Sequence, residues 1–124
     1  MASVLTVNLA PEKQHLIRVL SIRLNFSCRD IRPDEQSAVI SDLLNGIASS
    51  KSIGKPFRDE MIILDGFSHP DLNFILNELN RTGNTVPLKA VTTPTNIRWT
   101  VNMLHTQLVA ENAEMARRSR EVRK

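Results

Sequence analysis

Residues 60–67, EMIILDGF, decide the predicted fold of this chain. Met61 to Leu64 are consecutive apolar residues, so the strand that they form must be buried on both faces. Such a strand lies inside a sheet that is covered by helices on both sides, as in α/β proteins. Working outward from this strand, we expect strands and helices to alternate along the chain.

The residues after this strand predict a helix, another strand and a final helix. Ser68 and Asp71 have the spacing of a capping box, and Gly83 ends the helix that they start. Its apolar stripe consists of Leu72, Ile75, Leu76 and Leu79. Residues 88–92 follow as a strand. Thr93 or Thr95 then caps the last helix, whose stripe is made of Ile97, Val101, Leu104 and Leu108.

The residues before the central strand predict a similar order. Residues 4–9, VLTVNL, form a strand, and Pro11 opens a helix. Residues 26–31 form a weaker strand, whose polar side chains indicate a sheet edge. A helix with apolar residues at 39, 40, 43, 44 and 47 follows, and residues 49–59 are typical of a loop.

This order, β-α-β-α-β-α-β-α, favours an α/β fold with a four-stranded, mostly parallel sheet and helices on both faces. The alternative is an α+β, ferredoxin-like fold with an extra C-terminal helix. A faint internal repeat is also present, because VLTVNLAPE and LNFSCRDI resemble MIILDGFSHPD and NTVPLKAV in layout.

Charge is distributed unevenly along the 124 residues. Residues 116–124 have five basic side chains and one acidic one, a net charge of +4, which leaves −1 of the total +3 for the rest. We therefore predict a single α/β domain at residues 1–115 and a basic, partly disordered or helical tail at 116–124. The nearly neutral body and the scarcity of aromatic residues argue against nucleic-acid binding.

The cysteine content, the apolar runs and the N-terminus predict a cytoplasmic protein. Cys28 is the only cysteine and excludes an intramolecular disulfide. In its apolar surroundings we expect it to be a buried hydrophobic residue rather than a nucleophile. No apolar run approaches the roughly 18 residues of a membrane span, and the N-terminus, MASVLTVNLAPEKQ, lacks the features of a signal peptide.

Ligands of doubly wound sheets bind at the carboxyl ends of the strands. In a parallel sheet, residues 8–12, 32–35, 65–71 and 92–96 would meet at that edge. We expect an anionic ligand there, near a helix N-terminus, although the same residues also make ordinary helix caps. The ligand-binding candidates are Asp65, Ser68, His69, Thr93, Thr95, Asn96 and Trp99. Trp99 alternatively fills the core.

Catalytic and metal-binding signals are weak. His69 and Asp65 could form an acid–base pair, but His69 is expected in the exposed first turn of a helix. His15 and His105 have no cysteine or carboxylate at ligand spacing, so we predict no metal site. A Gly-rich phosphate loop, a G-x-S-x-G elbow and a paired-cysteine motif are all missing. We therefore assign no catalytic residue and no cofactor.

Two stretches resemble an uncharacterised bacterial family known as domain of unknown function 3783. The first is MIILDGFSHPDLNFILNELNRTG, with its Gly66–Phe67–Ser68 turn. The second is PLKAVTTPTNIRWTVNMLHTQLVAENAEM, which begins at Pro87. The resemblance is strong over the second half of the chain and looser at VLTVNLAPEK. It implies a small bacterial cytosolic protein and brings no activity with it.

We therefore expect a non-enzymatic binding or regulatory module that contacts a protein partner or a small anionic ligand. A homodimer is compatible with the sequence. The alternative is a small enzyme or sensor that binds an anionic metabolite at the helix N-terminus formed by residues 93–96, which for an enzyme requires His69 to face a closed pocket. A further hypothesis, contact of the tail with nucleic acid, would show a steep salt dependence.

Overall fold

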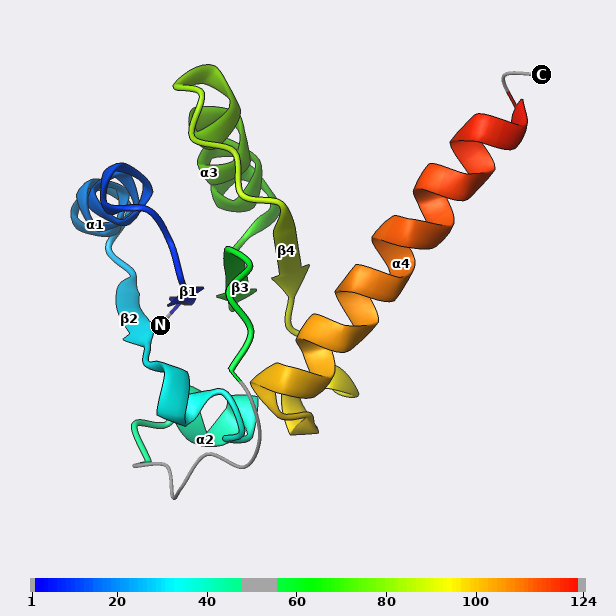
Figure 1. The fold of residues 1–124 in the computed structure, drawn as a ribbon. Coiled ribbons are helices and arrows are strands. Elements are labelled where there is room, and N and C mark those ends of the chain that lie inside the picture. The colour runs from blue at the N-terminus through cyan, green and yellow to red at the C-terminus, as the bar shows by residue number, and fades with distance from the viewer. Residues whose placement is uncertain (1, 48–55, 123–124) are drawn as a thin grey trace.

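The computed structural model describes residues 2–47 and 56–122 and has the predicted alternation of strands and helices (Figure 1). The elements are, in chain order, β1 (Ser3–Val7), α1 (Pro11–Leu24), β2 (Ser27–Ile31), the 3₁₀ turn η1 (Pro33–Glu35), α2 (Ile40–Leu44), β3 (Met61–Asp65), α3 (His69–Arg81), β4 (Leu88–Val91), the 3₁₀ turn η2 (Asn96–Arg98) and α4 (Val101–Val122). Most of the predicted loop at residues 49–59 lies outside the described residues.

The sheet has the strand order β2-β1-β3-β4. The outer pairs, β1 with β2 and β3 with β4, are parallel, whereas the central strands β1 and β3 are antiparallel. The four strands and the edge position of β2 are therefore as predicted. Two of the three strand pairs are parallel, but the central pair, β1 and β3, is antiparallel, so the predicted parallel order is wrong there. The ferredoxin-like alternative is wrong too, because β1 pairs directly with β2 instead of leaving room for a strand between them.

The chain consists of two similar halves, residues 3–47 and residues 61–122. β3 starts 58 positions after β1, at Met61 and Ser3, and α3 starts 58 positions after α1, at His69 and Pro11. Left-handed residues recur at the same offset, Asn8 and Gly66 after the first strand of each half, and Asn25 and Gly83 after its helix. The faint sequence repeat therefore corresponds to a structural repeat of two β-α-β units.

An approximate two-fold axis relates the halves. Leu5 of β1 pairs with Ile63 of β3, its own counterpart at the offset of 58. A second antiparallel contact joins the halves at the bridge between Val39 and Thr100. There the amide of Ile40 donates to the carbonyl of Trp99 at 2.9 Å, and the amide of Val101 donates to that of Ala38 at 3.1 Å.

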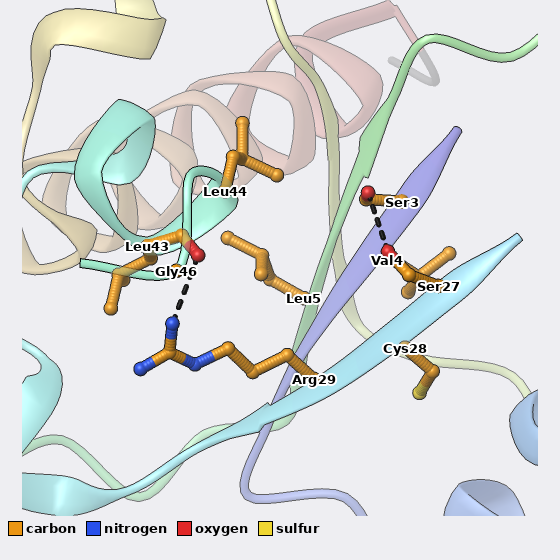
Figure 2. Close-up of a pocket in the computed structure, with 9 residues that line it drawn as sticks. All are labelled: Ser3, Val4, Leu5, Ser27, Cys28, Arg29, Leu43, Leu44 and Gly46. Atoms are coloured by element: carbon orange, nitrogen blue, oxygen red, sulfur yellow. Dashed lines mark hydrogen bonds between the residues drawn. The ribbon is translucent and has the colours of Figure 1, made fainter. Parts of the chain in front are cut away.

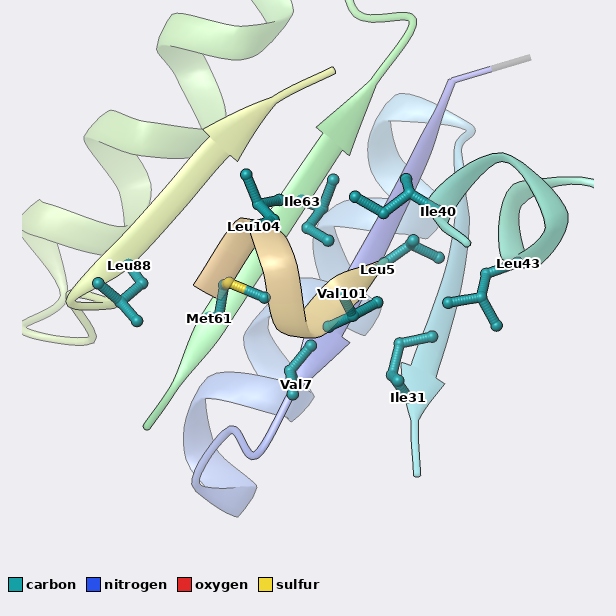
Figure 3. Packing of buried hydrophobic residues seen from close by; sticks show 10 residues of the cluster. All are labelled: Leu5, Val7, Ile31, Ile40, Leu43, Met61, Ile63, Leu88, Val101 and Leu104. Atoms are coloured by element: carbon teal, nitrogen blue, oxygen red, sulfur yellow. The ribbon is translucent and has the colours of Figure 1, made fainter. Parts of the chain in front are cut away.

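Each face of the sheet has its own apolar core. α1 and α3 cover one face, where Ile17 and Ile75 are buried against Val4, Ile62 and Leu64. The other face packs against α2 and the start of α4, and Figure 3 shows Ile40, Leu43, Val101 and Leu104 over Leu5 and Ile63. Met61 to Leu64 are all fully buried, as their uninterrupted apolar run predicts.

Two helices differ from their predicted extents. α2 is shorter than the apolar residues 39–47 indicate, and Ile47 is exposed. The last helix does not begin at Thr93 or Thr95, because the backbone at Trp99 is extended and Thr100 joins the bridge to Val39. α4 therefore begins at Val101, and Thr100 Oγ1 accepts a hydrogen bond from the amide of Met103 at 3.1 Å.

α4 is continuous to Val122 and passes residue 116, where the predicted tail begins, without a break. Its first two turns bury Val101 and Leu104, and Leu108 packs partly against the same core. Beyond this point the helix leaves β4 and extends away from the sheet (Figure 1). In the described part of the chain, no helix combines the length and the apolar character needed to cross a membrane.

Candidate functional site

The antiparallel centre divides the predicted ligand edge in two. Since β1 and β3 run in opposite directions, residues 8–12 and 32–35 follow strands that end at one edge, while residues 65–71 and 92–96 lie at the opposite edge. The prediction that all four segments meet is therefore wrong. The candidate residues nevertheless all lie at the end of β3 or after β3 and β4, so most of them remain near one edge, which we call the β3–β4 edge.

Asp65 and Ser68 both have structural partners at the β3–β4 edge. Thr92 Oγ1 donates to Asp65 Oδ1 at 2.5 Å and links the ends of β3 and β4. Ser68 caps α3, with its hydroxyl accepting a hydrogen bond from the amide of Asp71 at 3.3 Å, as predicted. His69 is the first residue of α3 and is exposed, so it does not face a closed pocket with Asp65.

Thr93 and Asn96 cap each other. The amide of Thr93 donates to Asn96 Oδ1 at 2.8 Å, and the amide of Asn96 donates to Thr93 Oγ1 at 3.0 Å. Asn96 Nδ2 also donates to the carbonyl of Val91 at 3.1 Å. Thr95 is exposed and makes no capping hydrogen bond with its side chain. The predicted cap therefore belongs to Thr93, and it stabilises the short turn η2 instead of α4.

Trp99 does not join the other candidates. Its side chain is half-buried and packs against the core beneath α2 and α4. α3, which begins at Ser68 and His69, covers the opposite face of the sheet. The structure thus brings Asp65 next to Thr92 and Thr93 next to Asn96, and it keeps Trp99 on a different face from Ser68 and His69.

Sequence reasoning missed a polar cluster around Phe57, at the edge opposite the β3–β4 edge. The amide and the carbonyl of Phe57 both bond to the side chain of Gln36, at 2.9 and 3.3 Å, and Asn8 Nδ2 donates to the same carbonyl at 2.9 Å. The ring of Phe57 stacks on His105 with centroids 3.8 Å apart. His105 Nε2 also lies 2.7 Å from Asp59 Oδ2.

This cluster attaches the segment before β3 to the rest of the protein. Gln36 is almost fully buried, with an exposed fraction of 1%, so its amide needs the Phe57 backbone as a partner. His105 and Asp59 are 46 positions apart, which is why no local spacing indicated the pair. The donors and acceptors of the cluster satisfy one another, and a structural role accounts for them.

Two buried or partly buried glutamates are held ionised by cationic neighbours. Burial opposes the ionisation of Glu35, but the Arg32 amide and the Arg29 guanidinium outweigh it and lower the pKa of Glu35. Burial likewise opposes the ionisation of Glu60, whereas Lys13 and the Ala10 amide lower its pKa overall. Glu35 therefore links η1 to β2, and Glu60 links the start of α1 to the residue before β3.

A cavity of about 160 Å³ lies between β1, β2 and the end of α2 (Figure 2). Ser3 and Ser27 lie there with their hydroxyl oxygens 2.7 Å apart. Arg29 donates to the carbonyl of Leu43 at 3.0 Å, while the sulfur of Cys28 points away from that carbonyl. Cys28 is half-buried and not fully buried as predicted, and this burial raises the pKa of its thiol, which favours the protonated form.

Side chains that could bind a metal are dispersed in the described part of the chain. Within residues 2–47 and 56–122, no three side chains of His, Cys, Asp or Glu come together in a way that could hold a metal ion. A bound metal needs such a group of ligands at short range.

Comparison with known proteins extends this description in one respect. No curated protein and no solved structure matches the chain. One family model does match, over residues 60–115, from the residue before β3 to the middle of α4. The match covers almost all of the second half of the molecule. It confirms the resemblance seen in the sequence: residues 60–115 match the family described as Domain of unknown function (DUF3783).

Proposed function

We propose that this protein is a non-enzymatic binding module of the bacterial cytosol that contacts a protein partner through α4. One observation carries the proposal: the apolar stripe of α4 continues where the helix no longer covers the sheet. Val101 and Leu104 are buried, Leu108 is half-buried, and Met115 has an exposed fraction of 68%. The spacing places these four residues along one side of the helix.

The length of the projecting segment supports the same proposal. Residues 109–122 form 14 helical residues beyond the last side chain that packs on the core. Isolated helices of this length are marginally stable in water, even when their sequence favours helix formation. A partner that covers the apolar stripe would supply the tertiary contacts that the sheet does not.

The alternative, an anionic ligand at residues 93–96, has less support. The amides of Thr93 and Asn96 would be the groups to bind an anion, but each donates to a side chain of the same turn. An enzyme that uses His69 would need this side chain in a closed pocket, and His69 is exposed. Asp65, Ser68, Thr93 and Asn96 are accounted for as caps and links between strands.

Oxidative footprinting of two methionines tests the proposal. Met103 and Met115 lie on different sides of α4 and have exposed fractions of 53% and 68%. Both thioethers should oxidise readily in the dilute purified protein. In cells that produce this protein naturally, we expect Met115 to be less oxidised relative to Met103, because the partner covers only the apolar stripe.

The deciding quantity is the ratio of Met115 to Met103 oxidation. A ratio that is lower in cells than in dilute solution supports a partner on α4. The same ratio in both settings would show that α4 binds no partner, and the proposed function would then be wrong. Met103 acts as the internal control for differences in oxidant concentration.

A further inference from the structure

We infer that the partner of α4 is a second copy of this chain, and that the two α4 helices pair in antiparallel orientation through residues 111–118. This inference rests on the proposed function and names the partner of the same surface. Two properties of the described residues support it: the spacing of the apolar residues and the distribution of charge along the helix.

The apolar residues of α4 have the spacing of a helix-pairing surface. Val101, Leu108 and Met115 follow one another at intervals of seven, and Leu104 occupies the position three residues after Val101. A seven-residue repeat keeps the same side of a helix against a neighbouring helix. The members of this series up to Leu108 pack on the core of their own chain, so Met115 remains for a partner helix.

The charges along α4 favour a second copy of the same helix, in antiparallel orientation, as the partner. Glu111 and Glu114 precede Arg117 and Arg118, so the exposed segment is acidic at its start and basic at its end. If two copies of residues 111–118 lie antiparallel and are centred on each other, Glu111 lies beside the partner's Arg118. In a parallel pair, each charge would lie beside an identical charge, which is unfavourable.

These side chains remain accessible to a neighbouring helix. Within its own chain, Glu114 pairs with Arg117 and Arg118 at 2.6 and 3.2 Å, and Glu111 accepts a hydrogen bond from Gln107 at 3.1 Å. Arg117 and Arg118 are nevertheless more than half exposed. Carboxylates accept more than one donor, so the same groups can also bond across an interface.

Sedimentation equilibrium of the full-length chain over a series of concentrations tests the inference. We expect a species of twice 14.0 kDa that dissociates on dilution. Met115→Glu should weaken the dimer by roughly tenfold or more, because it places a charge in the apolar stripe. Met103→Glu is the matched control: the same residue type and substitution on another side of the same helix should leave association unchanged.

A charge exchange tests the antiparallel direction. Glu111→Arg alone should weaken the dimer, since it faces the partner's Arg118. Adding Arg118→Glu should restore association, because the opposite charges are again paired, in exchanged positions. Circular dichroism of each variant checks that the helix content is retained. No restoration in the double variant would overturn the antiparallel pairing.

The results also separate this inference from the proposed function. A purified chain that stays monomeric at every concentration, or equal weakening by Met115→Glu and Met103→Glu, would overturn the homodimer. If Met115 is protected in cells while the purified chain is monomeric, the homodimer is wrong and a different partner occupies α4. If Met115 is unprotected both in cells and in concentrated solution, both proposals are wrong.

Discussion

The two halves of the molecule share one plan and differ in their last helix. In each half, a β-α-β unit is followed by a 3₁₀ turn, a bridging residue and a helix on the same face of the sheet. α2 ends after five residues, whereas α4 has 22. Both bury two side chains in the shared core, Ile40 and Leu43 or Val101 and Leu104. A short helix is therefore enough to cover the sheet at this position, and residues 109–122 of α4 are not needed for it.

The 3₁₀ turns of the two halves also differ in chemistry. η1 buries Glu35, which pairs with Arg29 at 2.5 Å and accepts a hydrogen bond from the Arg32 amide at 3.0 Å. η2 is instead held by the neutral pair Thr93 and Asn96. The same backbone turn is thus stabilised by charge in one half and by neutral hydrogen bonds in the other, so acid should affect the first half more.

Substitutions at the contact between the halves should have the largest effect. Ile63→Ala and Leu5→Ala each remove a buried side chain at the approximate two-fold axis and should each lower the free energy of unfolding by about 2–5 kcal/mol. Urea denaturation measures both losses. If the halves fold as one unit, each variant unfolds in a single transition. Two separate transitions would show that the halves are independent.

Loss of the charge on Glu35 should have the next largest effect. Glu35→Gln should lower the free energy of unfolding by roughly 1.5–3 kcal/mol near neutral pH, the contribution of hydrogen bonds to a charged group. Because the pKa of Glu35 is lowered in the folded state, its stabilisation is complete above the unfolded pKa of about 4.3 and disappears as the pH falls through the folded pKa.

Urea denaturation at several pH values measures this dependence. The stability difference between the wild type and Glu35→Gln should shrink as the solution is acidified. Asp34→Asn is the matched control, because Asp34 is an exposed carboxylate in the same turn, and its loss should change stability little at any pH. A Glu35 difference that stays constant with pH would show that the charge of Glu35 contributes nothing.

The cap of η2 should have a smaller effect that does not depend on pH. Thr93→Ala removes the hydroxyl that accepts the Asn96 amide and should cost about 1 kcal/mol, as for other capping residues. Thr95→Ala is the control, because Thr95 makes no capping hydrogen bond with its side chain. Equal losses of stability in thermal unfolding of the two variants would contradict the assignment of Thr93 as the cap.

Shortening α4 should have the smallest effect on the fold. A chain that ends at Ala110 keeps Val101, Leu104 and Leu108 and makes the second half more similar to the first. In dilute solution, where a dimer would dissociate, its free energy of unfolding should change by less than about 0.5 kcal/mol. A loss of several times that value would mean that residues 111–122 stabilise the body directly.

Much of the architecture was predictable from local patterns. The apolar run at residues 61–64, the stripe that ends at Leu79 and the turn at Gly83 predicted a buried strand, a helix and its end, and all three are present. Thr93 was predicted as a cap, and it is one, but for η2. The pairings of Gln36 with Phe57 and of His105 with Asp59 could not be predicted from local patterns, because each joins residues far apart in the sequence.

Local sequence patterns were sufficient to predict the order of the strands and helices, the burial of β3 and the resemblance of residues 60–115 to one family. The direction of β1 relative to β3 and the point where α4 leaves the sheet are known only from the three-dimensional arrangement. Side-chain periodicity reports which face of an element is buried. It does not report which way the neighbouring strand runs, or where along a helix the covering surface ends.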